Sequence, residues 1–482
     1  MATTSQPPPD DPKAGAAPEE VPKVSPLVPL IVAASLFMEG LDTSIVNTAL
    51  PRMADTFHVT APQMSSAITA YLLALAVFIP VSGWIADRFG ARKVYCTAIA
   101  CFTFGSMMSG FASSINMLIF ARIIQGFGGA MMTPVGRLIL ARSFPKDQLM
   151  RAMTFYMMPA NLGPTIGPIL GGAITAAFGW QWNFFINLPF GVLGIALALR
   201  YIPDARLPAT SRFDWWGYLI LAAGLAAAQL SLENLAQPEI KGVTQTFLVL
   251  AAISFLVAYG IHAARTPSPV LDFRLFRQRV FGVSIGFGNL LRLGTFPVSF
   301  LVALLLQVGF SLGPFETGVL FAFFTIGAVT MRANIANLAR MFGLRRVLIT
   351  CSLITAAVTV GFVFFTKDTP HWFIAMYLFC FGVLRNAQHQ SVYALSYAEV
   401  TTEDMSKSTT ITALMQRGAQ SIGVGLAASL LAIFSGVGGP MGPEPFRPVF
   451  LVLAAITAVT AIGFAQLKPD DGWQVSGYKP KT

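Results

Sequence analysis

Long apolar stretches dominate this sequence. From residue 26 to about residue 467, stretches of roughly 20 residues follow one another, separated only by short polar loops. A stretch of about 20 residues can cross about 30 Å of hydrocarbon as a helix. A helix also satisfies its own backbone hydrogen bonds, which lipid cannot do. The pattern therefore predicts an all-α polytopic membrane protein.

The composition supports this prediction. Charged residues make up 11% of the 482 residues and hydrophobic residues 55%, whereas an average soluble protein is about 25% charged. These values exclude a disordered chain, a nucleic-acid-binding surface and an ordinary soluble two-domain enzyme. The cysteines lie in apolar stretches without metal-ligand spacing, so we interpret them as packing residues. They are Cys96, Cys101, Cys351 and Cys380.

The apolar stretches predict fourteen membrane-spanning helices. The first 25 residues are rich in Pro, Ala and charge, so we expect a disordered tail there rather than a signal peptide. The expected spans are 27–50, 63–86, 94–112, 115–141, 150–175, 183–203, 215–234, 244–264, 280–308, 314–338, 347–366, 371–397, 409–435 and 447–467.

Basic residues alternate between the loops. Loops after even-numbered spans hold 17 Lys and Arg, and loops after odd-numbered spans hold 4. Cytoplasmic loops carry an excess of Lys and Arg, so we expect both termini in the cytoplasm. The net charge of +10 thus indicates topology rather than an acidic partner.

Two loops of the chain have similar sequences. Residues 89–94 read FGARKV and residues 342–347 read FGLRRV, each at an expected helix–loop–helix junction. Parallel repeats are typical of secondary transporters that move one half against the other. Six residues alone are weak evidence for duplicated halves.

The first expected span contains two acidic residues, Glu39 and Asp42. Three residues apart on a helix, they share a face, and a carboxyl group in such surroundings can exchange a proton near neutral pH. Arg122, in the fourth span, must face water or a partner, and either acid is a natural partner. We therefore predict proton coupling at Glu39, Asp42 and Arg122. The alternatives are an Asp42 that only hydrogen-bonds polar neighbours and an ion pair that only locks two helices.

The fifth expected span carries a repeated Gly-Pro pair. Glycines four residues apart form one stripe, which lets another backbone approach closely, and the prolines remove backbone donors. A helix of this kind can act as a pivot or seal, although plain tight packing explains the small residues too. The residues are Gly163, Pro164, Gly167, Pro168, Gly171 and Gly172.

The loop between the second and third spans combines glycines, an acid and basic residues. We interpret Gly83, Asp87, Arg88, Gly90 and Arg92 as a conformational latch. The basic residues can hold cytoplasmic helix ends, and Asp87 can cap or pair locally. A topology signal is the alternative, but it would need neither the acid nor the glycines.

Other polar residues inside the expected spans are candidates to line a substrate cavity. His389 can titrate, although a lone histidine is more often a packing residue. No Walker loop, zinc signature or nucleophile elbow occurs, so we expect no enzyme activity, no metal and no cofactor. The cavity candidates are Gln125, Asn161, Asn289, Arg292, Gln307, Gln388, His389, Gln416 and Arg417.

These motifs together resemble the major facilitator superfamily, and specifically its branch of 14-helix drug:proton antiporters. The similarity covers nearly the whole chain, and its motifs are specific for fold and mechanism class but not for substrate. Three departures are Glu39, where the most similar members carry an uncharged residue, Ala91 in place of arginine, and Arg340 in place of an acid. The matching segments are residues 41–51, 83–95, 122–126, 163–172, 180–189, 274–279, 291–312 and 406–425.

The resemblance implies two six-helix bundles, at 26–204 and 266–467, with two linker transmembrane helices at 205–265. Cytoplasmic tails would be 1–25 and 468–482. It also implies location in a bacterial inner membrane and proton-coupled efflux of small organic molecules by alternating access, driven by the proton gradient.

Six arginines inside spans leave open a dedicated exporter of an anionic metabolite or chelate. A more remote alternative is a membrane sensor or scaffold that does not transport. The expected partners are the substrate, protons and the bilayer, with no nucleic acid. We expect a monomer and leave a periplasmic adaptor open.

Overall fold

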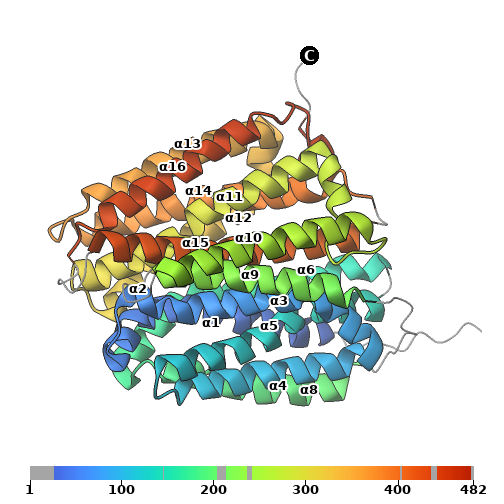
Figure 1. Cartoon of the computed structure of the whole chain (residues 1–482), viewed down its shortest axis with the longest axis horizontal. Coiled ribbons are helices and arrows are strands. Elements are labelled where there is room, and N and C mark those ends of the chain that lie inside the picture. Colours follow the sequence, from blue (N-terminus) through green and yellow to red (C-terminus); the bar gives the residue numbers. More distant parts are fainter. Residues whose placement is uncertain are drawn as a thin grey trace, which may run out of the picture.

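The computed structural model describes residues 27–144, 146–203, 213–235, 242–401, 404–435 and 442–478. Helices make up the secondary structure of these residues, which contain no strand (Figure 1). The α-helices are α1 Val28–Phe57, α2 Ala61–Met64, α3 Ser66–Phe89, α4 Ala91–Gly110, α5 Ile115–Ser143, α6 Lys146–Phe178, α7 Trp182–Phe185, α8 Asn187–Tyr201, α9 Trp215–Leu235, α10 Gly242–Arg265, α11 Arg279–Leu304, α12 Pro314–Phe342, α13 Leu344–Gly361, α14 His371–Ala398, α15 Met405–Ser435, α16 Phe446–Phe464 and α17 Trp473–Ser476.

The polytopic membrane architecture is confirmed. Within the described residues, 11 helices are long and apolar enough to cross a membrane. Each expected span overlaps one long helix, but α4, α6 and α14 are not among those 11. In α14 the polar run at 385–390 interrupts the apolar sequence. The total of fourteen spans therefore stays a prediction.

The long helices pack in two groups. In the first group (α1 to α8), α1 packs on α6, and α5 packs on α3 and α4. In the second group (α11 to α17), α12 packs on α14, α13 on α16, and α11 on α15 and α16. The groups meet mainly where α6 contacts α12 and where α3 contacts α15.

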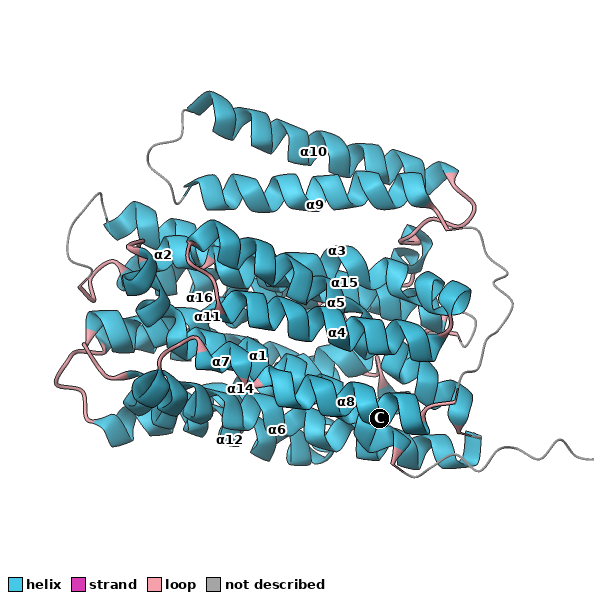
Figure 2. Cartoon of the chain, turned by 90° about the horizontal axis from the view of Figure 1, so that it is seen from below, coloured by secondary structure: helices cyan, strands magenta, loops and turns pink. Residues whose placement is uncertain are grey.

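The remaining two helices, α9 and α10, lie side by side along the outside of the molecule (Figure 2). Of this pair, α9 contacts α15 and α3, so it covers the line where the two groups meet. The predicted domain limits stay predictions, and those near 26 and 204 lie outside the described residues, as does the expected tail at 1–25.

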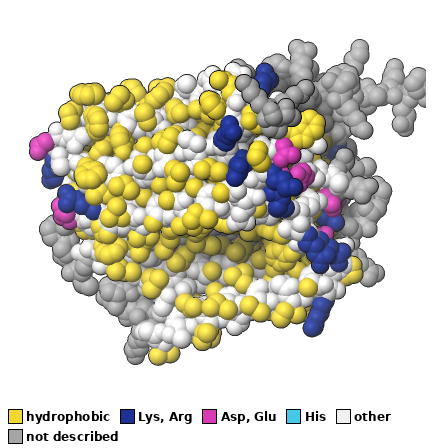
Figure 3. All heavy atoms as spheres, turned by 90° about the horizontal axis from the view of Figure 1, so that it is seen from above, with side chains coloured by type: hydrophobic (Ala, Val, Ile, Leu, Met, Phe, Trp, Pro, Cys, Tyr) yellow, Lys and Arg dark blue, Asp and Glu magenta, His cyan; other side chains and the backbone are white. Residues whose placement is uncertain are grey.

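The surface has the character that a bilayer requires. Apolar side chains form a broad band over the face in Figure 3, and charged side chains gather toward its two ends. Helix α10, for example, exposes Phe247, Ile253 and Val257. Exposed apolar patches of this size would be unfavourable in water, whereas hydrocarbon accepts them.

The two similar loops adopt the same local geometry. Gly90 is the single residue between α3 and α4, and Gly343 is the single residue between α12 and α13. Their φ angles are +93° and +78°, in a region that glycine adopts without a steric penalty. A tight one-residue connection therefore requires glycine at both positions.

The basic residues after these glycines also make equivalent contacts. Arg92 Nη1 donates to the carbonyl oxygen of Ile202 at 3.3 Å, directly after α8. Arg345 Nη2 donates to the carbonyl oxygen of Ala465 at 3.1 Å, directly after α16. Matching contacts at corresponding places in the two groups support the duplication that the sequence indicated weakly.

Candidate functional site

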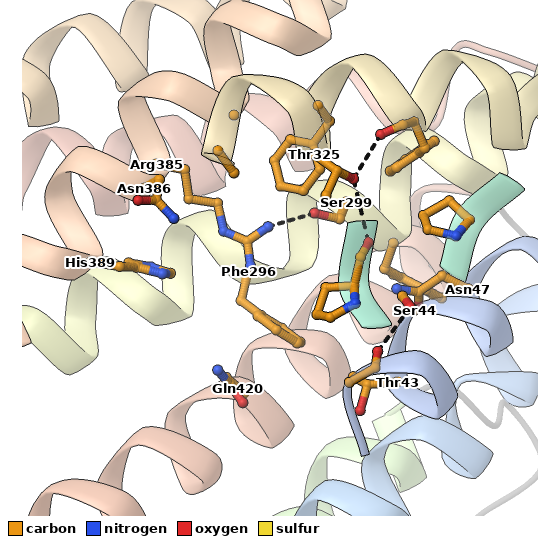
Figure 4. A pocket seen from close by; sticks show the side chains of 18 of the residues that line it. Thr43, Ser44, Asn47, Phe296, Ser299, Thr325, Arg385, Asn386, His389 and Gln420 are labelled. Carbon is orange, nitrogen blue, oxygen red and sulfur yellow. Dashed lines mark hydrogen bonds between the residues drawn. The ribbon is translucent and has the colours of Figure 1, made fainter. Parts of the chain in front are cut away.

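A cavity of about 460 Å³ lies between the two groups of helices. Its lining comes from α1 and α6 of the first group and from α11, α12, α14 and α15 of the second. Figure 4 shows polar side chains from both groups pointing toward it, among them Ser44 and Asn47 of α1 and Arg385 and His389 of α14.

Beside this cavity, Asp42 and Arg122 form a buried ion pair. Arg122 Nη1 lies 2.7 Å from Asp42 Oδ2, and each residue is 1% exposed. Gln125 closes a ring, because it donates to Asp42 Oδ1 at 2.8 Å and accepts from Arg122 Nη1 at 2.6 Å. Arg122 Nε also donates to the carbonyl oxygen of Ala67 at 3.1 Å, and the guanidinium stacks on the ring of Tyr71. These contacts satisfy a charged group that burial would otherwise make costly.

Glu39 has a different partner. It lines the cavity, forms an ion pair with Arg417 of α15, and accepts a hydrogen bond from Thr133 Oγ1 of α5 at 2.7 Å. Among the described residues, Glu39–Arg417 is the only ion pair that joins the two groups of helices.

The arrangement refines the prediction for the two acids. The sequence offered either of them as the partner of Arg122, and the structure pairs Asp42 with Arg122. Residues three apart on a helix differ by about 60° in direction. That difference lets Asp42 face Arg122 while Glu39 lines the cavity and reaches Arg417.

The cavity contains more positive than negative side chains. Arg332, Arg385 and Arg417 line it, and among the described residues Glu39 is the only carboxylate in its lining. Arg385 Nη1 donates to the hydroxyl of Ser299 at 2.8 Å (Figure 4). Within the described part of the chain, neither Arg332 nor Arg385 has a carboxylate partner.

Aromatic rings complete the surroundings of Arg385. Its guanidinium carbon lies 5.3 Å from the ring centre of Phe296 and 5.2 Å from that of Phe324. Cation–π contacts of this kind stabilise a guanidinium that lacks a counter-ion. They also place flat apolar surface directly beside a positive charge, where an amphiphilic organic molecule can be held.

Some of the predicted cavity residues line the cavity, and others lie elsewhere in the protein. His389, Gln416 and Arg417 line the cavity. The side chain of Asn161 lies outside the described residues. Contact of any of these residues with a substrate stays a prediction. The five that do not line this cavity are Gln125, Asn289, Arg292, Gln307 and Gln388.

Four of those five residues form hydrogen bonds within their own helices or with neighbours. Gln125 belongs to the Asp42–Arg122 ring. Asn289 donates to the carbonyl oxygen of Ile285 one turn earlier, and Arg292 donates to Asn289 at 3.4 Å. Gln388 of α14 donates to Ser352 at 3.3 Å. Gln307 Nε2 is buried without a partner among the described residues.

Sequence reasoning missed Arg332 as a cavity residue and left open whether Arg385 faces the cavity. Both carried a signal, since each is a charge inside an apolar span. The sequence does not tell which side of its helix such a residue faces. Arg332 donates through Nε and Nη2 to the side-chain amide oxygen of Gln390.

The glycine stripe of α6 lies against α1. A Cβ added to Gly163, Gly167 or Gly171 would approach an atom of α1 to 2.8 Å or less. A Cβ on Gly172 would lie 2.4 Å from the carbonyl oxygen of Pro314, at the start of α12. The stripe therefore lets α6 touch the helix that carries Glu39 and Asp42, and Gly172 lets it touch the second group.

The prolines of α6 leave a backbone group for α12. Pro168 has no N–H, so the carbonyl oxygen of Pro164 lacks its usual helical donor. The hydroxyl of Thr325 in α12 lies 3.5 Å from that oxygen and 3.1 Å from the carbonyl oxygen of Phe321 (Figure 4). This contact places a polar group of each half at the cavity wall.

The predicted latch residues make contacts inside the first group. Asp87 forms an ion pair with Arg142 at the end of α5, and the guanidinium of Arg88 lies 5.8 Å from the ring centre of Trp84. A Cβ on Gly83 would meet open space. A latch function for this loop stays a prediction.

Comparisons with known proteins agree with this architecture. A family model described as Major Facilitator Superfamily matches residues 32–308 and 284–481. The chain is 35% identical over 445 residues to the "Putative multidrug resistance protein MdtD" of Klebsiella pneumoniae (strain 342), covering 92% of this chain and 94% of that protein. It is 34% identical to the protein of that name from Pectobacterium atrosepticum, with coverage of 91% and 95%.

Solved structures share the fold at low sequence identity. A peptide transporter POT in complex with sulfate has a TM-score of 0.67 at 15% identity, covering 93% of this chain and 95% of that one. A D-xylose-proton symporter has a TM-score of 0.66 at 11% identity, with coverage of 92% and 98%. The family match over most of the residues and this shared fold lead to one conclusion: the chain belongs to the major facilitator superfamily.

Proposed function

We propose that the protein exports small organic molecules across a bacterial inner membrane in exchange for protons. The observation that carries the proposal is the cavity between the two groups of helices, where Glu39 and Arg417 form the ion pair that joins them. The relatives named as multidrug resistance proteins support the direction and the substrate class.

Proton uptake would act directly on the contact between the halves. A proton on Glu39 removes the negative charge that holds Arg417, and one on Asp42 does the same for Arg122. Loss of the Glu39–Arg417 attraction lets the second group move against the first, as alternating access requires. A cationic substrate would compete with Arg417 and with the proton for Glu39, so its binding and proton binding would exclude each other. That competition for Glu39 produces exchange of the substrate for protons.

The excess of arginine in the cavity favours a second candidate, export of an anionic metabolite or chelate. Arg332 and Arg385 have no carboxylate partner in the described residues, and a substrate carboxylate would supply one.

The proposal contains no chemical step and no cofactor, because the proton gradient supplies the energy. It places both termini in the cytoplasm on the basis of the loop charges, and it treats the protein as a monomer. A sensor or scaffold that does not transport would tolerate bulk in the glycine stripe, whose close contacts with α1 suit a moving or sealing helix better.

Substrate-driven proton flux in proteoliposomes tests the proposal. Candidate substrates come from a screen of growth and compound accumulation in cells with and without the gene, using dyes, antibiotics and organic acids. We expect Asp42→Asn and Glu39→Gln to lose flux and Arg340→Gln, an exposed change outside the cavity, to keep it. Equal flux in wild type and Asp42→Asn would remove Asp42 from the mechanism, and proton flux that rises only with anions would favour the second candidate.

A further inference from the structure

The outer helix α9 brings an acidic residue to the line where the two groups meet. Glu233, near the end of α9, accepts hydrogen bonds on Oε1 from Thr69 Oγ1 of α3 at 2.5 Å and from Gln229 Nε2 at 3.2 Å. Thr69 belongs to the first group of helices. The carboxyl group of Glu233, in the α9–α10 pair, is therefore hydrogen-bonded directly to the first group of helices.

A hydroxyl of the second group completes the contact. Ser421 of α15 lies 2.9 Å from Gln229 Oε1 and 3.1 Å from the carbonyl oxygen of Thr69. Thr69, Gln229 and Ser421 are at most 2% exposed. Glu233, Gln229, Ser421 and Thr69 thus form a polar ring across α9, α15 and α3, and it can persist only while α3 and α15 stay together.

A small cavity adjoins Glu233. Its volume is about 20 Å³, which is enough for one water molecule. Such a water could carry a proton to or from the carboxyl group. The residues that line the cavity are Pro62, Gln63, Ser65, Ser66, Glu233, Gly425, Ala428 and Ser429.

Glu233 differs from the other two acids in lacking a counter-ion. Glu39 and Asp42 pair with arginines, whereas Glu233 forms no ion pair with any described residue. The side chains that α3, α15 and α9 place around it are neutral, and Arg417, one turn from Ser421, is held by Glu39. Glu233 can therefore take up a proton without releasing a buried arginine.

We propose that Glu233 is a proton-binding site whose occupancy controls how firmly α3 and α15 hold together. Closing this contact removes water from the carboxyl group, which costs much more for a carboxylate than for a neutral acid. The hydrogen bonds from Thr69 and Gln229 offset only part of that cost. Proton uptake and closure of the α3–α15 contact therefore favour each other, by the reciprocity of linked equilibria. The site lies outside the central cavity and belongs to the inserted helix pair.

Hydrogen exchange of the full-length protein in lipid nanodiscs tests this proposal. Exchange in the first turns of α3 and over 421–429 of α15, corrected for the intrinsic pH dependence, is compared at mildly acidic and mildly alkaline pH. In the wild type we expect roughly tenfold faster exchange at alkaline pH, because closing the contact costs more when the carboxyl group is ionised and must lose its water. Because a glutamine is neutral at every pH, we expect the Glu233→Gln variant to show the slow exchange rate at both pH values.

The matched control is Glu316→Gln. Glu316 is an exposed glutamate in the first turn of α12, where it accepts from the backbone N–H of Gly313, and its change should leave the wild-type pH dependence intact. A wild type without pH dependence, or a Glu233→Gln variant that keeps it, would overturn the proposal.

A second variant covers the case in which Glu233→Gln does not fold. Thr69→Val removes a donor to the ionised carboxyl while keeping the shape of the side chain. We expect the pH midpoint of the exchange transition to move upward, and an unchanged midpoint would contradict the proposal. Because hydrogen exchange needs no substrate, its result is independent of whether the protein exports drugs or anions.

Discussion

Replacing Gly163 with alanine probes the contact that positions both acids of α1. A Cβ at this position would lie 2.6 Å from the carbonyl oxygen of Phe37 and 2.8 Å from the backbone nitrogen of Leu41. Both atoms belong to backbone, which cannot rotate away as a side chain can. Glu39 lies between these two residues, so any displacement of α1 here also changes the position of the carboxyl group relative to Arg417.

The size of the effect follows from these distances. Ordinary contact begins near 3.4 Å, so α1 and α6 must separate locally by up to 0.8 Å, the difference between 3.4 and 2.6 Å. Forcing an extra carbon into a packed interior typically costs about 1–3 kcal/mol. Alanine also stabilises a helix interior by about 1 kcal/mol relative to glycine. This gain offsets part of the cost of the clash, so a control variant is needed to correct for it.

Gly260→Ala provides that control. Gly260 lies inside α10, and a Cβ there has no other atom within 4 Å, so this variant reports the helix propensity alone. We expect Gly163→Ala to be about 1–3 kcal/mol less stable than Gly260→Ala, measured by denaturant unfolding with tryptophan fluorescence. We also expect slower transport by Gly163→Ala. If Gly163→Ala proves as stable as Gly260→Ala, then α1 and α6 are not in tight contact at Gly163.

Three further predictions concern charged side chains. Asp42→Asn leaves Arg122 buried without its carboxylate, so we expect a loss of about 3–5 kcal/mol in unfolding free energy; the double variant with Arg122→Gln should recover part of it, and no recovery would contradict the pairing. Asp471→Asn breaks a pair with Arg279, whose side chain is 42% exposed, so denaturant unfolding should show a loss of only about 1 kcal/mol or less. Arg385→Gln should weaken inhibition of transport by organic anions roughly 10- to 100-fold while neutral analogues inhibit unchanged, and equal inhibition of both proteins by anions would count against the anionic candidate.

Local features of this protein followed directly from the sequence. The helical spans were predictable because hydrocarbon accepts only segments that satisfy their own backbone hydrogen bonds. The close approach at Gly163, Gly167 and Gly171 was predictable because glycines four residues apart share one face of a helix, and the structure places that face against α1. The repeated FG loops likewise correspond to equivalent turns, at Gly90 and Gly343.

The partners of the charged residues could not be predicted in the same way. The sequence placed Glu39, Asp42 and Arg122 in the membrane but left open which acid pairs with the arginine. It also gave no role to Glu233, which lies near the end of α9 and becomes significant only because α3 and α15 pack beside it.

The sequence by itself therefore determined that this chain spans a membrane, which segments are helical, and which side chains are too polar for lipid. Those properties depend on transfer between water and hydrocarbon, which is a property of each segment alone. Tertiary structure decided that Asp42 holds Arg122, that Glu39 reaches Arg417 in the other half, and that Arg385 rather than Arg292 lines the cavity. The rotation of each helix about its own axis decides such pairings, and packing against neighbouring helices sets that rotation.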